Sequence, residues 1–175
     1  MTEEILGNPM HIIGPLLNER ADLPGGIAEF GVYAGRTTMQ LAQFRRYVWA
    51  FDTFEGIPAE DFTDGLDRDE PGKFAPPEDT YERLKRHPLI IPVRGRFEKT
   101  LPGCMGVTIV LAYLDCDLYL SAKCALDWLT RSLAPGGVIV LDDFQTHPGI
   151  RQAVNEFLDA HPQARFDGAM VIYWP

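Results

Sequence analysis

Long apolar runs that end at charged or turn residues are the main pattern along this chain. One run spans Val107–Leu114 and another spans Gly136–Leu141, and each is followed at once by aspartate. Runs of this length are typical of strands that are buried on both faces of a parallel sheet. Shorter runs at residues 26–32, 48–51 and 89–93 predict three further strands.

Stretches with helical periodicity separate these strands, as in proteins whose parallel sheet is covered on both faces. Two short segments around the turn Asp167-Gly168 predict a terminal antiparallel hairpin. Pro92 lies in the third strand, and because proline donates no ladder hydrogen bond we expect this strand at a sheet edge, where the order 3-2-1-4-5 places it. The expected helices are the stretch after Gly35 with Met39, Leu41, Ala42 and Phe44, and residues 79–86, 120–129 and 148–158.

The length fits a single domain over residues 1–175. Residues 1–23 carry weak helical periodicity, and this segment could be a lid, a contact between subunits of a homo-oligomer, or a helix that covers one sheet edge. Residues 53–78 form a long loop, of which the part from Glu55 to Glu70 holds seven carboxylates and a single arginine. Long loops inside compact domains are usually functional or disordered. Because this loop follows the carboxyl end of a strand, we assign it to the acceptor side of a site.

Charge and composition narrow the class of partner. Sixteen basic against twenty-five acidic residues give a formal net charge of −9, which disfavours nucleic acid or an anionic membrane as the partner. We find no basic-then-apolar leader and no apolar run near the ~18 residues of a membrane span. The three cysteines have no regular spacing, which fits a reducing compartment. We therefore expect a soluble, cytoplasmic protein.

Two pairs of aspartates follow the two longest apolar runs. Asp115 and Asp117 come after the first, and Asp142 and Asp143 come after the second. Ligands of open parallel sheets bind outside the carboxyl ends of the strands, so neighbouring strands would bring these acids to one crevice. Four clustered carboxylates repel one another unless a cation or raised pKa values relieve them. We expect a hard divalent cation.

A glycine turn follows the first strand. Gly31 and Gly35 lie between Glu29 and a helix, where glycine allows a tight turn and the helix-start amides offer donors to a ligand. The alternative is that these glycines serve only the turn. Their spacing lacks the Gly-x-Gly-x-x-Gly fingerprint of dinucleotide-binding proteins, which disfavours a dehydrogenase. Asp52 ends the second strand about twenty residues later, where doubly wound nucleotide sites place an acid on the ribose hydroxyls.

Some aromatic residues and one histidine allow two interpretations each. Phe97 follows the third strand and could stack on a base or belong to the core. The loop aromatics Phe54, Phe62 and Phe74 could line an apolar acceptor pocket or only pin the loop to the core. We interpret His147 as a helix-start residue rather than as part of the site, because a lone histidine carries little signal.

Five motifs come in order along the chain. They are Glu29-Phe30-Gly31-Val32 with Gly35, Phe51-Asp52-Thr53-Phe54-Glu55-Gly56-Ile57-Pro58, Gly95-Arg96-Phe97 with Thr100-Leu101-Pro102, Leu114-Asp115-Cys116-Asp117-Leu118-Tyr119, and Leu133-Ala134-Pro135-Gly136-Gly137 with Asp142-Asp143-Phe144. Together they resemble the macrocin O-methyltransferase family, class I S-adenosylmethionine enzymes of antibiotic-sugar tailoring. The resemblance extends from Gly26 to Leu158. It is specific because Asp-x-Asp-Leu-Tyr and Asp-Asp occur together.

The resemblance implies an α/β, Rossmann-like fold with a seven-stranded, mostly parallel sheet, helices on both faces and a terminal antiparallel hairpin. It also implies which residues bind S-adenosylmethionine, with the methionine end near the glycine turn and the ribose on Asp52. In the family, magnesium is held by carboxylates matching Asp115, Asp142 and Asp143, and a base matches Asp117. The cofactor-binding residues implied are Glu29, Gly31, Gly35, Thr37, Asp52 and Phe97.

The chain also departs from the family pattern. Family members generally carry a longer amino-terminal region that helps to cover the acceptor, and Cys116 stands where the family usually has glycine. The resemblance predicts methyl transfer from S-adenosylmethionine to a hydroxyl of a small sugar-like or natural-product-like acceptor, with Mg²⁺ or another hard divalent cation. Two alternatives are a nucleotide-dependent oxidoreductase on the same fold and a non-catalytic cofactor-binding protein.

Overall fold

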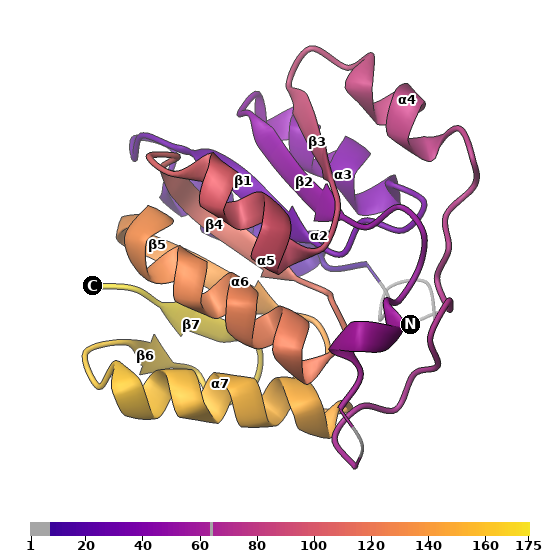
Figure 1. Ribbon diagram of the computed structural model, residues 1–175. Coiled ribbons are helices and arrows are strands. Elements are labelled where there is room, and N and C mark those ends of the chain that lie inside the picture. Colours follow the sequence, from indigo (N-terminus) through magenta and orange to yellow (C-terminus); the bar gives the residue numbers. More distant parts are fainter. Residues whose placement is uncertain (1–7, 64) are drawn as a thin grey trace.

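The computed structural model describes residues 8–63 and 65–175 and contains a seven-stranded sheet with helices on both faces (Figure 1). The strand order is β3-β2-β1-β4-β5-β7-β6. Strands β1 to β5 pair in parallel, whereas β7 is antiparallel to both β5 and β6. The fold class is therefore confirmed, as are the edge position of β3 and the terminal hairpin. The strands are β1 (Gly26–Phe30), β2 (Val48–Asp52), β3 (Ile90–Arg94), β4 (Ile109–Leu114), β5 (Leu133–Leu141), β6 (Arg165–Phe166) and β7 (Val171–Tyr173).

The helices bury two separate apolar cores against the two faces of the sheet. One core holds residues of α5, α6 and α7, such as Leu126 and Val154, and these helices lie together in front of the sheet in Figure 1. The other holds residues of α2, α3 and α4, such as Ile13, Leu41 and Leu84. The helices are α2 (Met10–Glu19), α3 (Arg36–Leu41), α4 (Thr80–Lys85), α5 (Phe97–Thr100), α6 (Tyr119–Ser132) and α7 (Pro148–Ala160), with 3-10 turns η1 (Ala42–Phe44), η2 (Ala59–Asp61) and η3 (Leu101–Cys104).

The helix expected within residues 1–23 is α2, and residues 1–7 lie outside the described part. Ile13, Leu16 and Leu17 of α2 are buried in the core that includes Val110 and Val140 of the central strands. The described part of this segment therefore packs on a face of the sheet.

Several strand boundaries differ from those predicted; β4, for example, begins at Ile109 rather than at Val107. β1 ends at Phe30 rather than at residue 32, because Gly31 has a φ of 92° and leaves the extended conformation. β5 begins at Leu133, three residues before the expected Gly136. Leu133 pairs with Ile109, but the register then shifts, so the intervening residues form an irregular, bulge-like stretch at the start of the strand.

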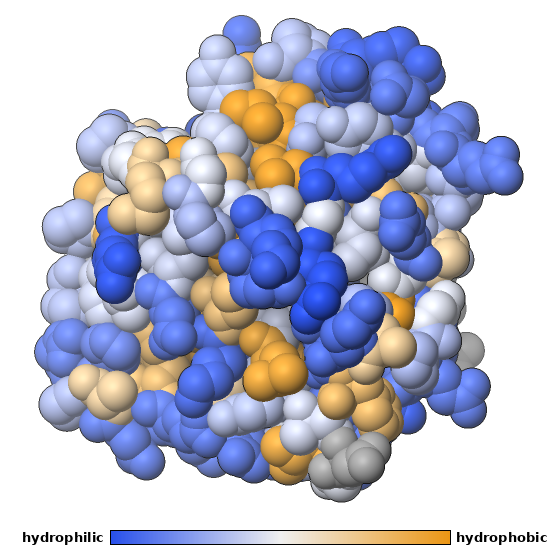
Figure 2. Space-filling view, viewed as in Figure 1, coloured by the Kyte–Doolittle hydropathy of each residue, from blue (hydrophilic) through white to orange (hydrophobic). Residues whose placement is uncertain are grey.

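The face that carries α5, α6 and α7 is mostly hydrophilic, and its apolar side chains form small, separate areas (Figure 2). Exposed apolar residues here include Met105 and Leu120. Single exposed apolar side chains are normal on a protein surface and do not mark an interface. None of the helices within residues 8–63 and 65–175 has both the length and the apolar character needed to cross a bilayer.

Candidate functional site

A cavity of about 410 Å³ opens at the carboxyl ends of β1, β2, β4 and β5. The sheet order changes direction between β1 and β4, and open α/β sheets bind ligands at such a switch point. Most lining residues come from the turns after these strands and from the loop at residues 53–78. The loop therefore borders the site, as its place after β2 predicted.

The two aspartate pairs meet in this cavity. The amide of Asp142 donates a hydrogen bond to the carbonyl of Leu114 at 3.0 Å, which keeps the ends of β4 and β5 side by side. Carboxylate oxygens of Asp115, Asp117 and Asp143 lie within 4.8 Å of one another. Asp142 lies beside this group, where its Oδ1 accepts a hydrogen bond from the hydroxyl of Tyr113 at 2.7 Å. The closest trio thus contains Asp117, the residue expected to act as a base, in place of Asp142.

Burial and mutual repulsion raise the pKa values of these carboxyl groups. Burial and then the neighbouring aspartates hold the pKa of Asp115 well above its ordinary value. Burial and then Asp143 raise the pKa of Asp117 to about 7. Burial raises the pKa of Asp142 as well, although the hydrogen bond from Tyr113 acts in the opposite direction. A divalent cation would counter these shifts, and a set of ligands made only of carboxylate oxygens fits magnesium or calcium.

The turn that carries Asp117 is tight. Asp117 has a φ of 60°, a left-handed conformation that aspartate tolerates better than most residues with a side chain. The amide of Leu118 donates to the carbonyl of Cys116 at 2.6 Å. Cys116 itself does not have a positive φ. The turn therefore accommodates a cysteine where the family usually has glycine.

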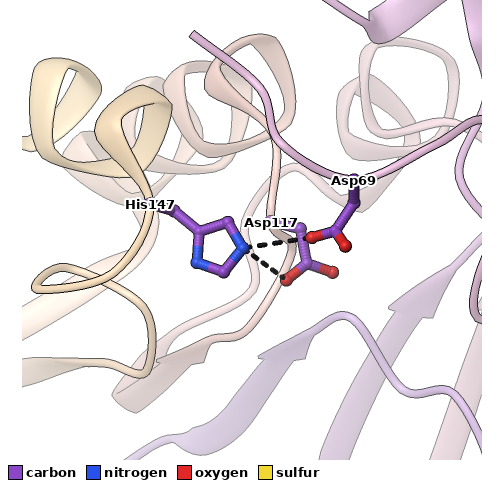
Figure 3. A group of neighbouring side chains, drawn as sticks. All are labelled: Asp69, Asp117 and His147. Carbon is purple, nitrogen blue, oxygen red and sulfur yellow. Dashed lines mark hydrogen bonds and ion pairs between the residues drawn. The ribbon is translucent and has the colours of Figure 1, made fainter.

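A second group of potential ligands adjoins the first (Figure 3). Asp69 from the loop, Asp117 from the turn after β4 and His147 from the start of α7 bring one ligand atom each within 4.8 Å of the others. Nε2 of His147 lies 3.0 Å from Oδ2 of Asp69 and 4.0 Å from Oδ1 of Asp117. Nδ1 lies 3.1 Å from Oδ1 of Asp143. His147 is the N-cap residue of α7, as expected, but its ring also belongs to the acid cluster.

Two ion pairs involve the loop, one within it and one that ties it to the start of α5. Lys73 pairs with Asp69, and Arg96 at the start of α5 pairs with Asp61 of η2. All four residues line the cavity, and both aspartates are buried. Burial opposes ionisation of Asp69, but the hydrogen bonds from Lys73 and His147 prevail and lower its pKa. Some of the carboxylates of the acidic loop therefore point into the protein rather than into solvent.

The loop aromatics have different surroundings. Phe74 lines the cavity and packs edge-on against Tyr33, with ring centroids 6.0 Å apart. Phe54 packs against Tyr81 at 5.2 Å and contacts the core on the α3 side. Phe62 is half-buried and is absent from the cavity lining among the described residues. Phe54 therefore pins the loop to the core, whereas Phe74 lines the cavity.

Asp52 lines the cavity and organises the glycine turn. Its Oδ2 accepts hydrogen bonds from the amides of Val32 at 2.6 Å and Tyr33 at 3.0 Å. Its Oδ1 accepts from the amide of Phe54 at 2.7 Å. Asp52 thus links the end of β2 to the turn after β1.

The two glycines of the turn are required by packing. A Cβ on Gly31 would lie 1.7 Å from the carbonyl oxygen of Asp115, so the ends of β1 and β4 can approach only with glycine here. Gly35 has a φ of 69° and precedes α3, and a Cβ on it would lie 3.0 Å from Leu84. Of the two, Gly31 also lines the cavity. The interpretation that they serve the turn therefore holds, and for Gly31 it is compatible with an adjacent ligand.

Three further expected cofactor residues lie at different depths. Phe97 lines the cavity and also packs edge-on against Phe30 in the core, at 5.5 Å between centroids. Glu29 is 1% exposed and lies behind the cavity lining. The pKa of Glu29 is raised to about 8, mainly by burial. The charge of Asp52 adds to this increase, and the hydroxyl of Thr38 opposes it. Thr37 is half-buried and outside the lining, whereas Thr38 faces Glu29 from α3.

Six residues discussed at the site were not selected from the sequence: Asp61, Asp69, Lys73, Arg96, Tyr113 and His147. Tyr113 could have been predicted from the sequence, because it precedes Asp115 by two positions and alternate residues of a strand point to the same side. Its hydroxyl lies 3.3 Å from Oδ2 of Asp115. Asp69 and Lys73 could not have been predicted in this way, because they lie in a loop whose sequence has no periodicity.

Comparison with known proteins identifies related chains. The family model described as Macrocin-O-methyltransferase (TylF) matches residues 16–173. A protein of Streptomyces olivaceus, named 8-demethyl-8-(2,3-dimethoxy-alpha-L-rhamnosyl)-tetracenomycin-C 4'-O-methyltransferase, is 29% identical over 174 residues, covering 87% of this chain and 66% of that protein. Demethyldecarbamoylnovobiocin O-methyltransferase of Streptomyces niveus is 28% identical over 164 residues, covering 83% of this chain and 61% of that protein. The chain thus spans less than two thirds of the length of these two relatives.

Solved structures agree with this match. The crystal structure of CalS11, a calicheamicin methyltransferase, superposes with a TM-score of 0.79 at 27% identity, covering 94% of this chain and 78% of that one. The O-methyltransferase NovP superposes with a TM-score of 0.72 at 24% identity, covering 98% of this chain and 77% of that one, which supports the fold.

Proposed function

Because the chain belongs to the macrocin O-methyltransferase family, we propose that it transfers a methyl group from S-adenosylmethionine to a hydroxyl of a small sugar-like or natural-product-like acceptor, with the help of a divalent cation. The observation that carries the proposal is the convergence of carboxylates from the ends of β4 and β5 in one cavity. The named relatives are O-methyltransferases, and the names of two mention a rhamnosyl group or a novobiocin derivative. The acceptor class of this chain is inferred from them.

Methyl transfer is an in-line displacement, so the protein must hold the acceptor oxygen close to the methyl group and aligned with it. In this proposal Asp52 holds the ribose of S-adenosylmethionine, and the turn at Gly31 borders the methionine end. Phe97 would stack on the base. These three residues line the same cavity as the acids, so donor and acceptor can meet there.

Asp115, Asp142 and Asp143 would hold the cation. When bound, a divalent ion stabilises negative charge on an acceptor oxygen and lowers the pKa of the hydroxyl. Asp117 would accept the hydroxyl proton at a carboxylate oxygen, which requires this group to be ionised before the transfer. Tyr113 would keep Asp142 oriented through the hydrogen bond to its Oδ1. Partners of this kind commonly fix the direction of metal-binding side chains.

Production of S-adenosylhomocysteine over a panel of rhamnosides and other glycosides tests the proposal. We expect turnover with at least one acceptor, and loss of that turnover when EDTA removes divalent ions and its return with Mg²⁺. Turnover that EDTA leaves unchanged would contradict the metal role. A parallel calorimetric comparison of S-adenosylmethionine with NAD separates the oxidoreductase alternative, which predicts tighter binding of NAD.

A further inference from the structure

Asp67 of the acidic loop is buried outside the cavity, at the amino-terminal end of α6. Its side chain is 8% exposed. Oδ1 accepts a hydrogen bond from the amide of Tyr119, the first residue of α6, at 2.8 Å, and Oδ2 accepts one from the amide of Thr63 at 2.6 Å. Leu118, the residue at the N-cap position, offers no capping side chain. Asp67 therefore caps α6 from 52 positions earlier in the chain.

The same loop segment also contacts the start of α7. The amide of Gly149 donates to the carbonyl of Leu66 at 3.1 Å. A Cβ on Gly149 would lie 2.6 Å from Oδ1 of Asp67, so the carboxylate occupies the space of the missing side chain. Two residues further on, Asp69 lies 3.0 Å from the ring of His147. Residues 66–69 thus touch the first turns of both helices that follow the acid-bearing strands.

These contacts lie next to the turns that carry the acids. Tyr119 follows Asp117 by two positions, and Asp117 has a left-handed backbone conformation that the surroundings must maintain. The upstream end of this turn is fixed by the amide of Asp115, which donates to the carbonyl of Phe30 at 2.9 Å. The downstream end is fixed by the hydrogen bond from Tyr119 to Asp67. The loop therefore supplies one of the two anchors of the turn.

We propose that Asp67 is a positioning residue for the methyl-transfer site. By holding the starts of α6 and α7 in one frame, it sets the spacing between Asp115 and Asp117 on one side and Asp143 on the other. This inference rests on the proposed function, because that spacing matters when the carboxylates share a cation. It assigns to the acidic loop a role in assembling the metal site, in addition to bordering the acceptor side.

Three variants and one control test this role. Asp67→Ala removes the cap, whereas Asp67→Asn retains a side-chain oxygen that can accept the amide of Tyr119. Gly149→Ala leaves Asp67 in the chain but fills the space that its carboxylate needs. Glu60→Ala removes an exposed carboxylate from the same loop and serves as the control. Thermal unfolding of each variant shows whether it folds.

Calorimetric titration with Mn²⁺, and separately with S-adenosylhomocysteine, gives the first readout. We expect Asp67→Ala and Gly149→Ala to weaken Mn²⁺ binding about 10-fold or more, the range found for residues that orient metal ligands, with S-adenosylhomocysteine affinity within about twofold of wild type. Asp67→Asn should bind Mn²⁺ with an affinity within about threefold of wild type. The control Glu60→Ala should bind Mn²⁺ with the same affinity as wild type. Wild-type Mn²⁺ affinity in both Asp67→Ala and Gly149→Ala would overturn the proposal, as would an equal loss for Asp67→Asn and Asp67→Ala.

Amide hydrogen exchange of the metal-free protein gives a second readout that does not depend on the ion. We expect the amides of Tyr119 and Leu118 to exchange at least about 10-fold faster in Asp67→Ala than in wild type, and to be protected again in Asp67→Asn. Unchanged protection would overturn the anchoring role. A wild-type protein that binds no Mn²⁺ would instead refute the proposed metal site, and the exchange result would then decide alone whether Asp67 orders the turn.

Discussion

The hydroxyl of Tyr113, within β4, donates a hydrogen bond to Asp142, the first residue after β5, at 2.7 Å. Tyr113 is 2% exposed, and burial together with the nearby carboxylates raises its pKa far above the ordinary value, so it remains a neutral donor. This contact joins the ends of two neighbouring strands through their side chains. It also gives one acid of the cluster a fixed direction.

Tyr113→Phe should therefore weaken divalent-ion binding. The change removes the donor but keeps the ring, so we expect an affinity for Mn²⁺ about 10-fold lower with little change in the affinity for S-adenosylmethionine. Tyr119→Phe is a matched control, because its hydroxyl contacts Glu156 on α7 and not the acid cluster. Equal Mn²⁺ affinities in the two variants would show that the hydroxyl of Tyr113 does not orient the site.

Asp52→Ala should weaken the binding of S-adenosylmethionine. The variant loses a charged acceptor for the ribose and also the hydrogen bonds that hold Val32 and Tyr33. Hydrogen bonds to charged groups are worth about 1.5–3 kcal/mol, so we expect the dissociation constant to rise roughly 10-fold to 100-fold. Glu55→Ala, which removes an exposed acid three positions later, is the control. Calorimetry that finds the same constant for wild type and Asp52→Ala would remove Asp52 from the cofactor site.

The variant Asp117→Asn distinguishes two possible roles of Asp117, a general base and a metal ligand. Asp117 lies within 4.8 Å of Asp115 and Asp143, so both roles fit its position. Asparagine cannot accept the proton but keeps a ligating oxygen. If Asp117 is the base, kcat should fall about 100-fold or more while the affinity for Mn²⁺ changes less than about threefold. A loss of Mn²⁺ affinity as large as the loss of kcat would make Asp117 a ligand instead.

Glu29→Gln should change how stability depends on pH. The pKa of Glu29 is raised to about 8 in the folded protein from 4.5, mainly by burial. A raised carboxyl pKa means that the unfolded chain releases its proton first, so the stability that this group contributes is present below pH 4.5 and is lost as pH rises towards 8. The loss is roughly 1 kcal/mol per pH unit in this window.

Glutamine cannot ionise, so Glu29→Gln should gain stability relative to wild type as pH rises from 5 to 8. Urea unfolding at several pH values measures this difference. Glu55 and Glu60 are exposed, so the control variants Glu55→Gln and Glu60→Gln should show no such gain in stability with rising pH. A difference between wild type and Glu29→Gln that stays constant over this range would mean that Glu29 has an ordinary pKa.

Much of the fold followed from the sequence because its central strands are continuous apolar runs. The run before Asp115 is buried at every position of β4, and such runs leave little choice of element. The position of Pro92 correctly placed β3 at the edge. Boundaries were less accurate where the backbone changes direction for tertiary reasons. The bulge after Leu133 depends on pairing with β4, which no local pattern encodes.

The candidate site was predictable where side chains are fixed to strand ends. Asp115 and Asp143 meet because the topology brings β4 and β5 together. Asp67 and Asp69 were not predictable, because their inward direction depends on contacts with helices that come at least 50 positions later. For Thr37 the prediction missed by one position, since its neighbour Thr38 is the residue that faces Glu29. A helix of six residues leaves its inward face poorly determined by pattern alone.

In the proposed mechanism, carboxylates from the ends of β4 and β5 share one divalent cation beside the bound cofactor. The decisive experiment is a titration of Mn²⁺ into the protein saturated with S-adenosylhomocysteine, for wild type and for Asp115→Asn and Asp143→Asn. We predict a single site in wild type whose affinity falls about 10-fold or more in each variant, with cofactor affinity preserved. Absence of Mn²⁺ binding in wild type, or equal affinity in all three proteins, would contradict the account.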